Sequence, residues 1–148
     1  MSSNWQERRV VVTGLGVVTP LGNDVDTFWK RLIAGECGID RITAFDPTGY
    51  DTQVAGQVSE LDLTQAFPNP KEVRRTDRYS QFGVHAGWQA LKDSGADLGK
   101  LNCDEIGVIL GSGIGGLETT TAQVKVLLER GPGRVSPFMI PMLILNMA

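Results

Sequence analysis

Thiol and imidazole chemistry in this chain could come from only three side chains. The sequence has two cysteines, Cys37 and Cys103, and one histidine, His85. A cysteine nucleophile needs an activated thiolate with a base nearby. Neither cysteine has a second Cys or a His at the spacing of a metal site, so free thiols are expected. His85 lies in a helical run beside small residues, which favours a structural role, and no residue of this chain is predicted to be catalytic.

A glycine motif indicates a second kind of chemistry, which is phosphate binding. Gly111, Gly113 and Gly116 match the dinucleotide fingerprint after a strand-like run and before a helical run. In such proteins the pyrophosphate binds at the helix N-terminus. The acidic residue expected about 20 positions later could only be Glu129, which falls inside the helical pattern. A dinucleotide-binding domain that uses Gly111–Gly116 stays an alternative.

A cluster of cations indicates a third kind of site. Lys71, Arg74, Arg75 and Arg78 recur at i, i+3, i+4 and i+7, so a continuous helix would carry them on one face. They stand near a predicted helix N-terminus, where the helix dipole disfavours cations. The chain as a whole has a formal net charge of −3. The cluster is therefore either a docking surface for an acidic partner or a solvated face.

Strand-like and helical segments alternate along the chain, and they must position these groups. Buried strands are predicted at Arg9–Thr13 and Glu105–Leu110, with a short strand at Val54–Val58 after a loop at 36–52. This alternation indicates an α/β fold in which helices cover a mixed or parallel sheet.

Capping residues mark the predicted helices. The first runs from Asn23 or Asp24 to Gly35, the second starts at Asn69, the third spans about Asp77 to Ser94, and the last passes Leu117 and Leu128 to end at Gly131-Pro132. The third helix carries a stripe of small residues, and we expect another backbone to approach it closely there: Gly83, Ala86, Gly87 and Ala90.

Composition excludes several classes of protein. The 148 residues are 41% hydrophobic and 21% charged, which is typical of one soluble globular domain. The acidic balance gives no reason to expect nucleic acid or an anionic membrane as a partner. No run approaches the roughly 18 apolar residues of a membrane span. The polar start lacks the apolar core of a signal peptide, so the cytoplasm is the expected location.

Several motifs, taken in order, resemble the β-ketoacyl-acyl-carrier-protein synthases of the fatty-acid elongating type II, within the thiolase superfamily. The similarity runs from about Arg8 to Ala148. It rests on Val10–Gly22, Gly35-x-x-Gly-Ile39, Phe45-Asp46, Gly111–Gly116, Gly131-Pro132, Ser136–Pro141 and Asn146-Met147.

The resemblance implies the N-terminal half of a thiolase-like layered fold, with residues 1–148 forming the part that precedes the nucleophile. The family joins an acyl thioester to malonyl-acyl carrier protein by decarboxylative Claisen condensation, using one cysteine and two histidines and no cofactor. Cys37, Cys103 and His85 match none of these three residues. The chain alone is therefore expected to be inactive.

The resemblance also implies site residues and partners. Ile114 and Met139, with Phe138 beside it, match the acyl tunnel, and Met139 would reach the partner subunit of a homodimer. Acyl carrier protein would dock on Lys71, Arg74, Arg75 and Arg134. Plain core roles for Ile114 and Met139 stay open, as does a non-catalytic chain-length partner of a polyketide synthase, in which glutamine would replace the cysteine.

Overall fold

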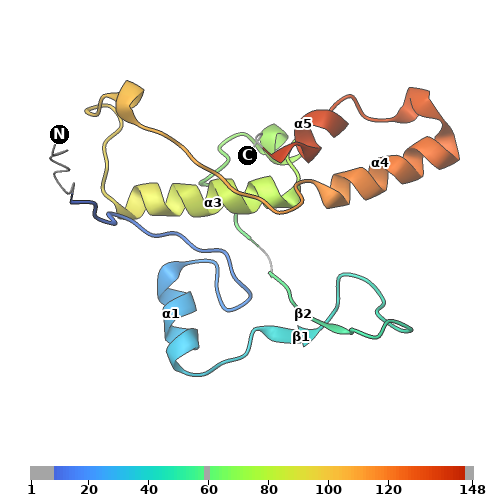
Figure 1. The fold of residues 1–148 in the computed structure, drawn as a ribbon, viewed down its shortest axis with the longest axis horizontal. Helices are drawn as coiled ribbons and strands as arrows, with labels where there is room; N and C mark the ends of the chain where they lie inside the picture. Colours follow the sequence, from blue (N-terminus) through green and yellow to red (C-terminus); the bar gives the residue numbers. More distant parts are fainter. Residues whose placement is uncertain (1–8, 59–60, 146–148) are drawn as a thin grey trace, which may run out of the picture.

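The computed structural model describes residues 9–58 and 61–145, and Figure 1 shows their arrangement. In chain order the elements are α1 (Val25–Ile33), β1 (Ile39–Arg41), β2 (Val54–Gly56), α2 (Pro70–Val73), α3 (Arg78–Asp93), a 3₁₀ turn at Cys103–Glu105, α4 (Leu117–Arg130), a 3₁₀ turn at Pro132–Arg134, and α5 (Met139–Leu143). The long helices α3 and α4 lie along the long axis, with α1 and the β1–β2 ribbon on one side of them (Figure 1).

Helix α1 begins and ends where its capping residues predict. Asp24 has an extended backbone, and its carboxylate accepts a hydrogen bond of 2.8 Å from the Thr27 N–H. This satisfies one of the N-terminal amides that a helix cannot bond internally. Gly35 follows the helix with a φ of 72°, which a residue with a side chain rarely adopts.

We predict that Asp24→Ala lowers the free energy of unfolding by about 1 kcal/mol. The hydrogen bonds from Thr27 hold the pKa of Asp24 below its usual 3.8. A lowered folded-state pKa means that the stabilisation is complete above pH 3.8 and is lost as the pH falls through the folded value. Urea unfolding across a pH series should show the two proteins converging in acid. A constant difference at every pH would contradict this assignment.

Helix α3 confirms the predicted span, and another backbone approaches it closely at two of its four small residues, Ala86 and Ala90. It is capped by Asp77 and Ser94, and the segment around Gly14 and Gly16 packs directly on its backbone. A Cβ on Gly16 would lie 2.0 Å from the Ala86 carbonyl oxygen. The Gln89 side chain fixes the contact by accepting from the Val17 N–H and donating to the Val17 carbonyl oxygen.

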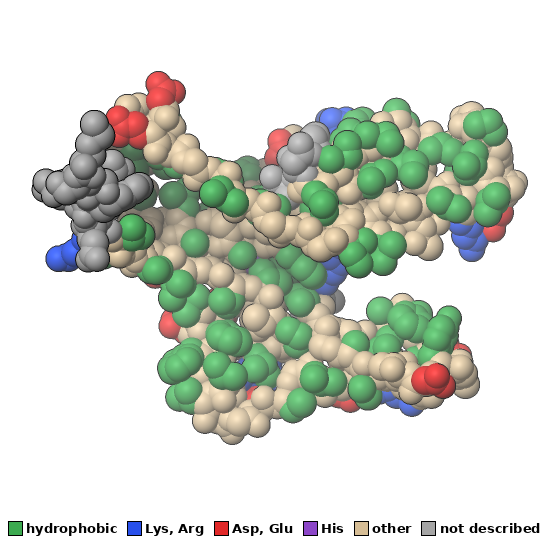
Figure 2. Space-filling model, viewed as in Figure 1, with side chains coloured by type: hydrophobic (Ala, Val, Ile, Leu, Met, Phe, Trp, Pro, Cys, Tyr) green, Lys and Arg blue, Asp and Glu red, His purple; other side chains and the backbone are tan. Residues whose placement is uncertain are grey.

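The strands predicted at Arg9–Thr13 and Glu105–Leu110 are wrong for this chain. Within the described ranges the one sheet is the antiparallel β1–β2 pair, with Ile39 opposite Gly56, and β1 lies in the predicted loop. A strand exists only if another backbone pairs with it, and these two runs have no such partner here. Their side chains are exposed instead, 89% for Val10 and 99% for Ile109. Figure 2 shows hydrophobic side chains at the surface over much of this face.

The basic cluster does not lie on one continuous helix, so its four side chains do not share the single helix face that their spacing would allow. Helix α2 ends at Val73, α3 begins at Arg78, and a turn separates them. The Thr76 hydroxyl donates to the carbonyl oxygens of Glu72 and Val73, and Asp77 then has an extended backbone. Such side-chain bonds compete with helix continuation. The four cations therefore lie on two helices and the turn between them.

Among the described residues, no helix combines the length and the apolar character that crossing a membrane requires.

Candidate functional site

Asp77 stands where α3, α4 and α5 meet. Its side chain is 6% exposed, and Oδ2 accepts a hydrogen bond of 2.8 Å from the Thr119 N–H in the first turn of α4. Gly116, just before α4, donates its N–H to the Leu143 carbonyl oxygen of α5. Two amides at the N-terminus of α4, those of Gly116 and Thr119, are therefore bonded to α5 and to Asp77.

This packing disfavours the dinucleotide alternative. A pyrophosphate would need the free amides at the start of α4, yet the Asp77 carboxylate already accepts one of them. A phosphate there would meet a buried negative charge. Glu129 lies in the last turn of α4 rather than after a second strand. Gly116 instead allows close packing, since a Cβ there would lie 2.5 Å from the Met142 carbonyl oxygen.

The turn that precedes α4 presents Ile114 outward. Ile114 is 71% exposed, so it is not a core residue of the described chain. The Ser112 hydroxyl oxygen accepts from the Gly115 N–H at 3.2 Å, and Gly115 has a φ of 78°. A left-handed backbone at this point favours glycine. The turn is thus braced internally by Ser112 and fixed to α5 at its Gly116 end, while Ile114 projects from it.

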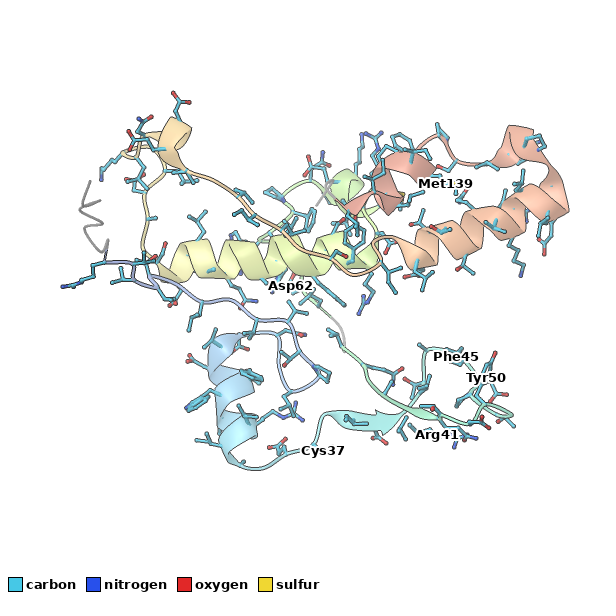
Figure 3. All side chains as sticks on the ribbon, in the orientation of Figure 1. Cys37, Arg41, Phe45, Tyr50, Asp62 and Met139 are labelled. Carbon is cyan, nitrogen blue, oxygen red and sulfur yellow. The ribbon has the colours of Figure 1, made fainter. Side chains whose placement is uncertain are left out.

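The other two predicted tunnel residues lie at the start of α5. Phe138 caps the helix and is partly exposed, and Met139 is its half-buried first residue (Figure 3). The Ser136 N–H donates to Gln123 Oε1 at 2.7 Å, which ties the segment before α5 to α4. The segment that leads into Phe138 and Met139 is therefore fixed to α4, the helix that the Ile114 turn precedes.

The structure brings one docking candidate into contact with one tunnel candidate. The Arg75 guanidinium lies over the Phe138 ring, 4.7 Å from its centroid. Lys71 and Arg74 are exposed nearby in the sequence, and Arg134 is exposed in the turn after α4. Arg78 differs, because it covers Phe82 and donates to the Val58 carbonyl oxygen. Arg78 therefore has a packing role that its spacing alone could not reveal.

The two thiols are exposed and lie apart from any base. Cys37 follows α1 (Figure 3) and bonds the backbone of Ile39, whereas Cys103 bonds the carbonyl oxygens of Leu98 and Leu101. His85 is buried in α3, with its ring 6.0 Å from that of Trp88. Neither thiol has a base among its hydrogen-bond partners in the described ranges.

The sequence predicts Asp77 only as the start of a helix. Its bond to the first turn of α4 was missed. Asp77 stands where an N-cap is expected, but it makes no side-chain bond to its own helix. Its bond to Thr119 spans 42 positions of sequence. No local pattern contains that information.

Comparison with known proteins identifies the family. The model of the β-ketoacyl synthase N-terminal domain matches residues 7–148. The chain belongs to the β-ketoacyl synthase family. It is 47% identical over 146 residues to a 3-oxoacyl-[acyl-carrier-protein] synthase 2 of Synechocystis, covering 99% of this chain and 35% of that protein. The relative with the same name in Vibrio cholerae is 47% identical, with 95% and 34% covered.

Solved β-ketoacyl synthases share the fold. A β-ketoacyl synthase from Burkholderia phymatum superposes with a TM-score of 0.77 at 28% identity, covering 95% of this chain and 35% of that one. A ketosynthase solved with a type II polyketide acyl-carrier protein gives 0.76 at 27% identity, with 95% and 36% covered. The predicted thiolase-like α/β class is therefore confirmed, and the chain spans about a third of the length of these relatives.

Proposed function

We propose that this chain is the N-terminal part of a condensing enzyme that elongates acyl chains in fatty acid biosynthesis. The observation that carries the proposal is the 47% identity to a 3-oxoacyl-[acyl-carrier-protein] synthase 2 over nearly the whole chain. In the reaction the acyl carbonyl carbon leaves its thioester sulfur and bonds to the α-carbon of the malonyl group. The electrons for that bond come from the carbon–carbon bond that breaks as carbon dioxide departs.

The proposed contribution of residues 1–148 is pocket and surface rather than catalysis. Ile114, projecting from a fixed turn, would gate the acyl tunnel. Phe138 and Met139 would line the tunnel, with Met139 contributed across a homodimer interface. A flexible thioether adapts to irregular apolar space, which suits a wall that meets acyl chains of different lengths. The nucleophilic cysteine and the two histidines would lie in the remainder of the enzyme.

Docking of acyl carrier protein is proposed for the exposed cations Lys71, Arg74, Arg75 and Arg134. Opposite charges at exposed positions steer an encounter more than they strengthen the final complex. Support comes from the exposure of these side chains and from a structural relative solved with its acyl-carrier protein. The Arg75–Phe138 contact would place the docking surface directly beside the tunnel wall.

A second candidate is the non-catalytic chain-length partner of a polyketide synthase. A solved ketosynthase/chain length factor superposes with a TM-score of 0.74 at 26% identity, covering 93% of this chain and 34% of that one. The residue at the nucleophile position of the full-length protein separates the two. Cysteine supports the condensing enzyme, and glutamine supports the chain-length partner.

We predict that residues 1–148 alone form no carbon–carbon bond from acyl and malonyl thioesters of carrier protein, whereas the full-length protein does. The reason is that, within residues 9–58 and 61–145, neither Cys37 nor Cys103 has a base among its hydrogen-bond partners. Mass spectrometry of the 3-oxoacyl product provides the measurement, with the full-length protein lacking its nucleophile as the matched control. Product from the fragment above that control would refute the assigned division of roles, and an inactive full-length protein would refute the proposed enzyme.

A further inference from the structure

The Asp77 carboxylate accepts a hydrogen bond from a neighbouring helix rather than from its own. Asp77 occupies the N-cap position of α3, where an Asp side chain normally accepts from its own first turn, but it makes no such bond. Oδ2 accepts instead from the Thr119 N–H at the start of α4. A buried carboxylate is stabilised there by the positive end of the α4 dipole.

The end of the Ile114 turn is packed tightly against the same carboxylate. A Cβ on Gly116 would lie 3.1 Å from Asp77 Oδ2 and 2.7 Å from the Leu143 Cα atom. The start of α3 also contacts the end of α5, because the Tyr79 hydroxyl donates to the Ile144 carbonyl oxygen. The path of the backbone from the turn into α4 is therefore set by contacts with Asp77 and with α5.

We propose that Asp77 is a positioning residue for acyl-chain selection: it fixes the turn Ser112–Gly116 and thereby the place of Ile114 in the tunnel. The inference rests on the proposed function, because it assigns Ile114 to the tunnel. A displacement of about 1 Å can change a reaction rate by about 100-fold when it moves a group that orients substrate. Loss of the Asp77 bond therefore alters the discrimination between long and short acyl chains, without touching the nucleophile.

The test uses the full-length enzyme with Asp77→Ala and Asp77→Asn, and Asp24→Ala as the matched control. Asp24 also accepts an N-cap bond of 2.8 Å, but on α1, away from the turn. Both alanine variants should lower Tm. Only Asp77→Ala should change the ratio of kcat/KM for long and short acyl thioesters, by about five- to tenfold. Asp77→Asn keeps an oxygen acceptor and should change the ratio less than about threefold.

A second readout does not depend on activity. Amide hydrogen exchange at residues 113–119 should accelerate in Asp77→Ala and stay unchanged in Asp24→Ala, because only the first opens the start of α4. If Asp77→Ala does not fold, Gly116→Ala replaces it, since its Cβ would strain the same junction.

The outcomes distinguish a failure of the positioning role of Asp77 from a failure of the proposed function. An unchanged long-to-short ratio in an active Asp77→Ala enzyme overturns the positioning role, and so does an equal change in Asp24→Ala. If the wild-type enzyme does not condense acyl thioesters, the proposed function fails. In that case unchanged exchange at residues 113–119 in Asp77→Ala would also show that Asp77 does not hold the turn.

Discussion

Replacing Gly16 by valine is expected to prevent the N-terminal segment from packing on α3 and to lower the free energy of unfolding by roughly 3 kcal/mol. A Cβ at this position would lie 2.0 Å from the Ala86 carbonyl oxygen and 2.8 Å from Gln89 Cβ. The nearest obstacle is helix backbone, which cannot rotate away as a side chain can. The segment must therefore move, and the paired Gln89–Val17 hydrogen bonds are lost with it. Chemical unfolding of the full-length protein measures the change.

Gly87→Ala supplies the matched control on the same helix. A Cβ on Gly87 would meet nothing within 4 Å. Alanine in a helix interior is more stable than glycine by about 0.5–1 kcal/mol, so this variant should stabilise. If Gly16→Val and Gly87→Ala change the free energy of unfolding equally, the close approach of the Gly14–Val17 segment to α3 is not the reason that position 16 requires glycine.

Reversing the charges of Lys71, Arg74 and Arg75 to Glu should reduce kcat/KM with carrier-protein substrates by about 100-fold or more in the full-length enzyme. A single exposed ion pair contributes only about 0.2–1 kcal/mol, so one substitution would have a small effect. Three reversals replace attraction with like-charge repulsion, which costs several kcal/mol at an interface. The defect should shrink with salt, because the Debye length falls from about 10 Å at 0.1 M to about 3 Å at 1 M.

Two controls separate docking from folding. Reversal of the exposed cations Lys30, Lys100 and Arg130 makes the same change in net charge on other parts of the surface and should leave kcat/KM nearly unchanged. Small thioesters without carrier protein should react almost normally with the first triple variant. Equal loss with both substrate types would assign the cluster to the fold, where Arg75 already contacts Phe138.

Features that depend on neighbours in sequence were predicted well. The caps at Asp24 and Asn69 and the span of α3 follow from local stereochemistry, whereas the predicted close approach occurs at Ala86 and Ala90 but not at Gly87. The strands at Arg9–Thr13 and Glu105–Leu110 failed for the opposite reason. β-Branched composition shows that a segment fits a sheet, but the pairing backbone must come from elsewhere, and these runs have no partner within the described ranges.

The same difference between local features and contacts of distant segments applies to the candidate site. Motif order was sufficient to predict the family and the turn that carries Ile114. It could not reveal the Arg75–Phe138 contact, because the two residues lie 63 positions apart in the sequence. Separate helix starts were predicted at Asn69 and about Asp77, but the end of α2 was not, and there the Thr76 hydroxyl donates to the carbonyl oxygens of Glu72 and Val73. Asn146-Met147, also part of the resemblance, lies outside the described residues.

The contact between the Gly14–Val17 segment and α3 also sets an order of events during synthesis. The hydrogen bonds from Leu15 and Val17 to α3 join residues 78 and 72 positions apart. Doubling a loop costs only about 0.6 kcal/mol more to close, so the separation hardly affects equilibrium stability. It affects timing, because at about 5–20 residues per second the ribosome completes α3 roughly 4–16 seconds after the segment. Through that interval the Gly14–Val17 segment has no helix on which to pack, so the Leu15 and Val17 amides lack their α3 acceptors until that helix has emerged.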